Sequence, residues 1–192
     1  FPSDEQLVRV APGDYNNDGR VDLVVSTNSI NAPCPIKLYW HTGDFTRPFS
    51  DAVCVNTEAT AALGPMDYDA DEDLDLVIGV FPNETYLLVN QITTTTAALP
   101  DTASPLTMTA DSLIDKQAPF LPYDFSWGDY NEDGLLDLAV AFPLDRRVRV
   151  YRNDGARLIP GPEIQTNMFR TPLAVAWGDM NGDGALDLAV AD

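Results

Sequence analysis

The chain is poor in positive charge. It has 192 residues, of which 11 are Lys or Arg and 30 are Asp or Glu, and its formal net charge is −19. A surface this negative repels phosphate groups, so we exclude nucleic acids and anionic membranes as partners. The sequence also lacks any run of about 18 apolar residues, so we expect no segment to insert into a bilayer.

The residues that most catalytic motifs need are scarce as well. His41 is the only histidine, and there is no Gly-x-Ser-x-Gly elbow, glycine-rich phosphate loop or zinc-ligand spacing. Carboxylates are abundant, but outside the repeats described below no two acids stand out as the pair that glycoside hydrolysis needs. We therefore expect that this chain is not an enzyme.

Cysteine is limited to Cys34 and Cys54, which lie symmetrically about Asp44 and can face each other across a hairpin. A disulfide that closes this loop would contribute about 3 kcal/mol and would indicate an oxidising compartment. Two buried free thiols are the alternative.

What the chain does contain is an internal repeat. Four segments, copies 1 to 4, align without gaps at spacings of 53, 62 and 50 residues; they begin at Asp14, Asp67, Asp129 and Asp179. This period is typical of one propeller blade or one solenoid unit. We treat 1–192 as a single region with repeats at about 1–58, 59–116, 117–168 and 169–192. The last repeat is partial and stops within an apolar run, so we expect the chain to be a truncated piece.

Each copy carries side-chain oxygens at positions 1, 3, 5 and 9 of a nine-residue loop. A hard cation such as Ca²⁺ takes about six to eight oxygen ligands, and alternate residues of a tightly curled loop can point inward. The side-chain candidates are Asp14, Asn16, Asp18 and Asp22; Asp67, Asp69, Asp71 and Asp75; Asp129, Asn131, Asp133 and Asp137; and Asp179, Asn181, Asp183 and Asp187. The backbone carbonyls at position 7 are further candidates, from Arg20, Asp73, Leu135 and Ala185. We expect three to four Ca²⁺ ions.

Position 6 is glycine in three copies, Gly19, Gly134 and Gly184, where a positive φ lets the chain turn sharply. Copy 2 has Glu72 there, so we expect a strained or differently shaped loop, with its extra carboxylates compensating in part. The same residues could form plain β-turns. Four copies favour cation binding, because crowded carboxylates repel one another and no Lys or Arg recurs at a fixed place to offset them.

The residues after the loops exclude an EF-hand. Such a loop needs a bidentate acid at position 12, where the four copies have Val25, Ile78, Val140 and Val190. The following segments are short, apolar and bounded by Asn, Pro or Asp, which is typical of buried strands. The loop therefore joins two strands of a sheet.

These motifs resemble the FG-GAP or VCBS repeats, the calcium-loop blades of integrin-type β-propellers. The resemblance rests on Trp127-Gly128-Asp129 and Trp177-Gly178-Asp179 before the loop, on the loop itself, and on the strand after it. Residues 148–155 resemble the family's next strand and turn. Copies 1 and 2 depart from the family with Pro12-Gly13 and Pro65-Met66 in the lead-in, which predicts a weaker strand entry.

The resemblance implies an all-β propeller, here about three and a half four-stranded antiparallel blades of a partial or truncated ring. The expected strands are 7–11, 21–26, 36–41 and 52–56; 61–64, 74–80, 85–89 and 106–110; 124–127, 136–142, 147–152 and 163–166; and 174–177 and 186–191. Such an array does not close. We therefore expect further blades of the same polypeptide, or neighbouring copies, to pair with its open strand edges.

Two segments lie outside the repeat pattern. Residues 90–115 form an insertion, which we interpret as a blade-edge loop rather than a glycosylated or partner-binding segment. Asn83-Glu84-Thr85 is a sequon, which makes Asn83 a candidate glycosylation site.

Trp127 and Trp177 occupy equivalent repeat positions, so we expect them to pack between blades rather than form a carbohydrate surface.

The resemblance implies a secreted or cell-surface calcium-binding module with a structural or adhesive role and a protein or carbohydrate ligand. Two alternatives stay open at this point. The chain could be the calcium-stabilised propeller of a secreted polysaccharide-active enzyme whose catalytic groups lie elsewhere, or a subunit of an extracellular filament built through open edges.

Overall fold

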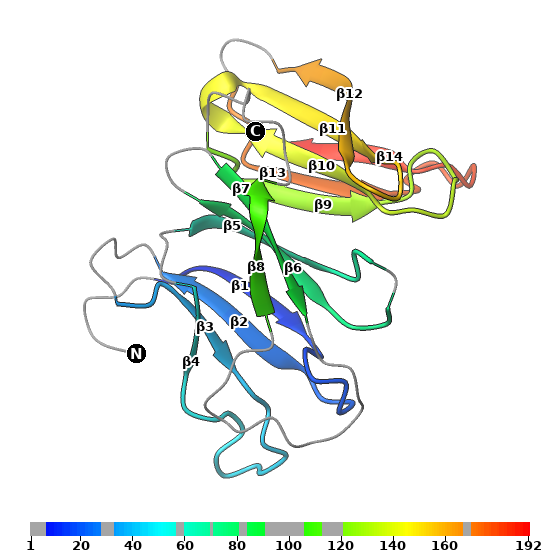
Figure 1. Ribbon diagram of the computed structural model, residues 1–192. Helices are drawn as coiled ribbons and strands as arrows, with labels where there is room; N and C mark the ends of the chain where they lie inside the picture. The colour runs from blue at the N-terminus through cyan, green and yellow to red at the C-terminus, as the bar shows by residue number, and fades with distance from the viewer. Residues whose placement is uncertain are drawn as a thin grey trace.

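The computed structural model describes residues 7–27, 33–56, 60–69, 71–80, 84–90, 106–112, 121–166 and 170–192. These residues form three four-stranded antiparallel sheets and one two-stranded sheet (Figure 1). In each sheet neighbouring strands are also consecutive in sequence, so each is a simple meander, the topology of a propeller blade. The predicted all-β class and the blades are confirmed, and no sheet closes on itself within the described residues.

The strands match the predicted set element by element. Blade 1 contains β1 (Leu7–Gly13), β2 (Asp22–Thr27), β3 (Ile36–Tyr39) and β4 (Val53–Asn56). Blade 2 contains β5 (Thr60–Met66), β6 (Asp75–Val80), β7 (Glu84–Asn90) and β8 (Leu106–Ser112). Blade 3 contains β9 (Asp124–Gly128), β10 (Asp137–Phe142), β11 (Arg147–Asn153) and β12 (Leu158–Gln165), with a 3₁₀ turn at Pro143–Asp145. The partial blade contains β13 (Ala174–Gly178) and β14 (Asp187–Ala191).

Three of the strands that are longer than predicted, β1, β5 and β12, have proline in the added part. β1 and β5 run on through Pro12 and Pro65, which pair with Leu23 and Leu76, so both strands continue up to the loop. β12 begins at Leu158 and includes Pro160. All three are edge strands of their sheets, where a residue without an N–H group leaves no ladder hydrogen bond unmade.

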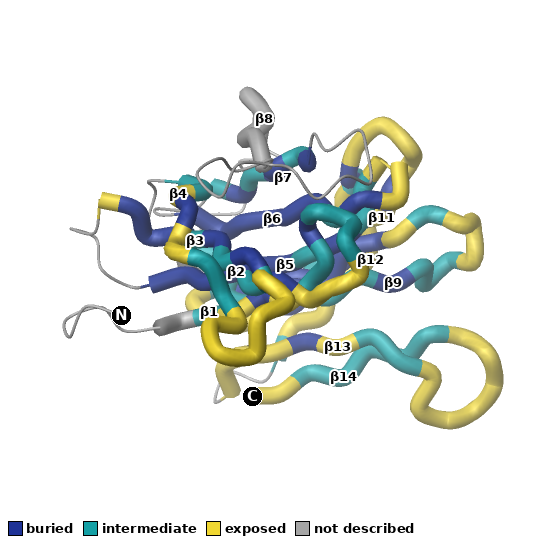
Figure 2. The backbone as a smooth tube through the Cα atoms, turned by 90° about the horizontal axis from the view of Figure 1, so that it is seen from below, coloured by how far each residue is buried: buried dark blue, intermediate teal, exposed yellow. Residues whose placement is uncertain are grey.

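The core lies between consecutive blades. β1 packs against β5, β5 against β9, and β9 against β13. The second strand of a blade is buried on both faces because side chains alternate: Leu76 and Ile78 of β6 join the cluster shared with blade 1, and Val77 joins the cluster shared with blade 3. Figure 2 shows β6 buried along its length and the strand-joining loop of the partial blade exposed.

The predicted role of the two repeat tryptophans in packing between blades is confirmed. Trp127 packs into the cluster between blades 2 and 3, and Trp177 into the cluster between blade 3 and the partial blade. The indole of Trp177 also stacks on the Tyr130 ring, with 5.7 Å between centroids. A Cβ atom on Gly128 would lie only 2.9 Å from Cγ of Trp177, so the missing side chain at residue 128 makes room for this ring.

Cys34 and Cys54 form a disulfide with a Cα–Cα distance of 5.7 Å, which confirms the predicted pairing over free thiols. The bond ties the segment before β3 to β4, at the outer edge of blade 1. Asn83 and most of the predicted insertion lie outside the described residues. Among the described residues, no helix has the length and hydropathy needed to cross a bilayer.

Candidate metal centres

All four predicted loops occupy the same place, between the first and second strands of a sheet. The aspartate at position 1 curls each loop by accepting the N–H groups of positions 5 and 6. Asp14 accepts from Asp18 and Gly19 at 3.0 and 2.7 Å. Asp129 accepts from Asp133 and Gly134 at 3.0 and 2.8 Å, and Asp179 from Asp183 and Gly184 at 3.2 and 3.0 Å.

Positions 3 and 5 continue this pattern. In copies 1, 3 and 4 the amide oxygen of the position 3 asparagine accepts the N–H of position 5, at 3.2, 2.9 and 2.8 Å. In every copy the position 5 aspartate accepts the N–H of position 7, at 2.9 to 3.1 Å. Each of these oxygens accepts backbone N–H groups and keeps lone-pair capacity for a cation.

The loops also turn at a residue that the sequence analysis missed. Position 4 has a positive φ of 54° at Asn17, 60° at Glu132 and 79° at Gly182. Asn and Gly are common in this left-handed region, but Glu is not. No residue type therefore marks the position in all copies.

The position 9 aspartates have a second structural role. Asp22, Asp75 and Asp137 are fully buried. One carboxylate oxygen of each accepts the N–H of the loop's second residue, at 3.1, 2.9 and 3.2 Å. The other accepts a backbone N–H at or just beyond the end of the third strand, from His41, Asn90 or Asn153, at 2.8, 2.7 and 2.8 Å. In copies 1 to 3 the position 9 aspartate therefore links the loop to the end of the third strand of the same sheet.

Burial makes the charge on these carboxylates costly. It raises the pKa of Asp22 and of Asp75 to about 6, and it raises the pKa of Asp137 as well. The backbone N–H donors oppose this shift, whereas the other loop aspartates add to it by charge repulsion. A nearby cation would offset both the burial and the repulsion.

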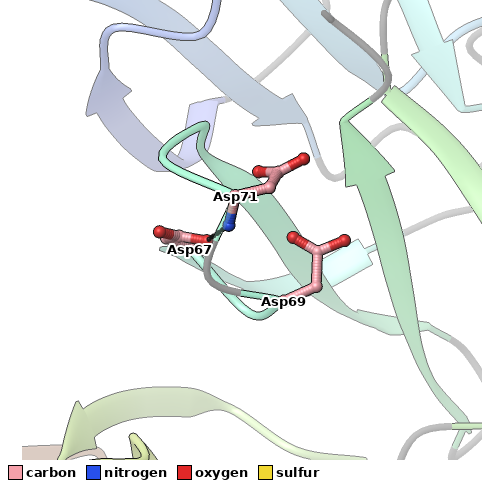
Figure 3. Close-up of side chains that lie close together, drawn as sticks. All are labelled: Asp67, Asp69 and Asp71. Atoms are coloured by element: carbon pink, nitrogen blue, oxygen red, sulfur yellow. Dashed lines mark hydrogen bonds between the residues drawn. The ribbon is translucent and has the colours of Figure 1, made fainter.

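Copy 2 brings its acids closest together. Asp67, Asp69 and Asp71 each place one oxygen within 4.8 Å of the others, the only such group of metal-ligating side chains among the described residues (Figure 3). Asp67 accepts the N–H groups of Asp71 and Glu72, both at 3.1 Å, as its counterparts do in the other copies. Glu72 holds a positive φ of 71°, so the predicted backbone strain is present.

The residue at position 7 has a charged side chain in copies 1 and 2, with a different environment in each. In copy 1 the guanidinium of Arg20 forms an ion pair with Asp18 at 2.6 Å. In copy 2 the Asp73 side chain is buried, and neither carboxylate oxygen has a hydrogen-bond partner among the described residues. Burial, followed by repulsion from Asp71 and Asp75, raises the pKa of Asp73 to about 7. The repeat pattern predicts only the backbone carbonyl of Asp73 as a ligand.

The donor set in all four loops consists of carboxylate, amide and carbonyl oxygens. These are the ligands that Ca²⁺ and Mg²⁺ prefer, and thiolate and imidazole groups are absent from the loops. Flexible coordination by many oxygens at loops of this kind favours the larger ion, Ca²⁺.

Comparison with known proteins agrees with this repeat assignment. A family model described as FG-GAP-like repeat matches residues 14–78 and 129–190, about two thirds of the chain. The first match spans the loops of copies 1 and 2, and the second spans those of copies 3 and 4. No curated protein matches the chain.

Proposed function

The chain belongs to the FG-GAP-like repeat family, and we propose that it is a calcium-binding module of a β-propeller. One observation carries the proposal. Four loops at equivalent places in four sheets share the same hydrogen-bonded curl, and each supplies oxygen donors at positions 1, 3, 5 and 9. Plain β-turns do not require three or more acids in nine residues of every copy, whereas a bound cation does.

The role we propose for the ions is mechanical. Each ion would hold the loop between a blade's first two strands, and the buried position 9 aspartate would connect that loop to the third strand. Four divalent ions would also add eight positive charges to a chain whose net charge is −19, which reduces its self-repulsion. The ions would thus set the shape of one end of every blade.

We further propose an extracellular location and a structural or adhesive role rather than a catalytic one. The disulfide between Cys34 and Cys54 supports an oxidising compartment. Weak calcium loops are loaded at the millimolar calcium concentrations found outside cells. Among the described strands β14 pairs with β13 alone, so a strand of a further blade or of a neighbouring copy would extend this sheet. A protein or carbohydrate ligand would then bind the assembled surface.

Thermal unfolding with calcium and with chelator tests the proposal. At a concentration 100 times the dissociation constant, one site stabilises the fold by about 2.7 kcal/mol, so the midpoint should rise by several degrees. Asp133→Ala should bind one ion fewer, because residue 133 is a ligand candidate of copy 3. The control Asp51→Ala removes a highly exposed acid outside the loops and should bind as many ions as the wild type. Equal midpoints with and without calcium would refute the proposal.

A further inference from the structure

The loops of copies 1 and 2 are joined by the side chain of one residue, Asn90, at the end of β7 in blade 2. Its amide donates to the carbonyl of Leu74 in the copy 2 loop at 3.1 Å and to the carbonyl of Tyr15 in the copy 1 loop at 3.0 Å. The Leu74 side chain also lies against blade 1, since a Cβ atom on Gly13 would come within 2.5 Å of its Cδ1. The two loops therefore share contacts across the boundary between their blades.

The hydrogen bonds of Asn90 continue to the position 9 aspartates of both loops. The N–H of Asn90 donates to Asp75 at 2.7 Å, and the N–H of Tyr15 donates to Asp22 at 3.1 Å. Asp22, Tyr15 and Asp75 are fully buried, and Asn90 has only 2% of its surface exposed. A chain of buried hydrogen bonds thus leads from Asp22 through Tyr15 and Asn90 to Asp75, and a satisfied buried network of this kind is rigid.

A second hydrogen bond joins the two loops nearer the surface. The side-chain amide of Asn17, at position 4 of copy 1, donates to the carbonyl of Glu72, at position 6 of copy 2, at 3.2 Å. Both residues have a positive φ, 54° and 71°, so both lie where the chain turns to form the curl of its loop. A change in the curl of one loop therefore alters a contact of the other.

Blade 3 has the same asparagine without the link. Asn153 takes the place of Asn90, and its N–H donates to Asp137 at 2.8 Å. Its side-chain amide donates at 3.2 Å to the carbonyl of Leu136 in its own loop, and to no carbonyl of blade 2 within the described residues. The hydrogen bond from the asparagine to the neighbouring blade is therefore a property of Asn90 rather than of the repeat.

We propose that Asn90 is a positioning residue that couples cation binding in copy 1 to cation binding in copy 2. This inference rests on the proposed function. An ion that orders the copy 1 loop would fix the Tyr15 carbonyl that Asn90 contacts, and less freedom would then remain to be lost when the copy 2 loop closes on its own ion. The reverse holds equally, because coupling between two sites is reciprocal. Each ion would thus strengthen the binding of the other.

Calorimetric titration of the full chain with Ca²⁺ tests this coupling. Asp133→Ala and Asp183→Ala first remove the sites of copies 3 and 4, so that two sites remain. Adding Asp18→Ala, which removes the copy 1 site, should weaken the copy 2 site by about fivefold or more. In Asn90→Ala the same change should weaken it clearly less, although the lost charge of Asp18 acts in both proteins. The matched control Asn153→Ala removes the same side chain from blade 3 and should leave the coupling unchanged.

Asn17→Gly keeps the test decisive if Asn90→Ala does not fold. Copy 4 already has a glycine at position 4, Gly182, with a φ of 79°, so glycine fits this turn and only the amide is lost. Asn17→Gly should reduce the coupling, and Glu132→Gly, at the same position of copy 3, should not. A copy 2 affinity that does not respond to Asp18→Ala, or that responds equally when the linking amide is removed, would overturn the coupling. Absence of calcium binding to the wild type would instead refute the proposed function itself.

Discussion

Replacing Glu72 with glycine should stabilise the protein. Glu72 has a φ of 71°, in the left-handed region that costs a residue with a Cβ atom about 1 kcal/mol. Its side chain is exposed and forms no hydrogen bond or ion pair with the described residues, so Glu72→Gly removes the strain without removing a contact. We expect the free energy of unfolding to rise by about 1 kcal/mol, which for a chain of this size raises the melting temperature by about 2–4 °C.

The opposite change in copy 3, from glycine to a residue with a Cβ atom, measures the cost of the positive φ independently. Gly134 has a φ of 88°, and a Cβ atom placed there would meet nothing within 4 Å. Gly134→Ala therefore adds backbone strain and no clash, and it should cost about 1 kcal/mol. Both variants are measured by denaturant unfolding in chelator, so that ion binding does not contribute. Glu72→Gln is the control that removes the charge and keeps the backbone strain. If Glu72→Gly is no more stable than Glu72→Gln, the reasoning from φ is wrong.

Two further predictions concern the position 9 acids and the packing between blades. The folded-state pKa of Asp22 and of Asp75 is raised to about 6, so their contribution to stability is full below the unfolded pKa of about 4 and is lost as the pH rises through 6. In chelator the free energy of unfolding should therefore be lower at pH 7.5 than at pH 5, by about 1 kcal/mol per group, because one pKa unit corresponds to about 1.4 kcal/mol and only the interval from pH 5 to pH 6 contributes; a flat profile would contradict this. Gly128→Ala should cost about 1–3 kcal/mol, because its Cβ would lie 2.8 Å from Leu186 and 2.9 Å from Trp177. Gly178→Ala, whose added Cβ would come no closer than 4.0 Å to the side chain of Met180, should be nearly neutral by the same denaturant assay.

The repeat and the loops could be predicted because local chemistry determines them. The curl forms because the N–H of the glycine at position 6 donates to the carboxylate of the aspartate at position 1, so all of its residues lie within six positions of the sequence. The second strands could be found for a similar reason: β6 and β10 are buried on both faces and read as short apolar runs. The symmetric placement of Cys34 and Cys54 likewise indicated the hairpin that their disulfide joins.

What could not be predicted depends on contacts between distant residues. The hydrogen bond from the Asn90 N–H to Asp75 joins residues 15 apart, and no local pattern distinguishes this asparagine from a turn residue. The burial of Asp73 likewise follows from how copy 2 lies in the folded chain, since Arg20 at the same position of copy 1 is exposed. The first part of β12, residues 158–162, lies outside the predicted strand 163–166, because the sequence alone does not show that this strand lies at the edge of its sheet, where Pro160 is tolerated.

Two separate sets of interactions hold each blade, and the proposed cations would act on only one of them. The clusters between blades are built from strand residues such as Val24, Ile78 and Val140, which are fully buried and uncharged. This packing does not depend on whether the loops hold an ion. At the loop end the buried position 9 acids link the strands through hydrogen bonds. Burial strengthens these hydrogen bonds, but it also raises the energetic cost of the charge on each carboxylate. A divalent ion offsets that cost without breaking a hydrogen bond, whereas a proton on Asp22 or Asp75 would compete with the N–H groups that each carboxylate accepts. For that reason we expect calcium to stabilise the loop end of each blade more effectively than acid does.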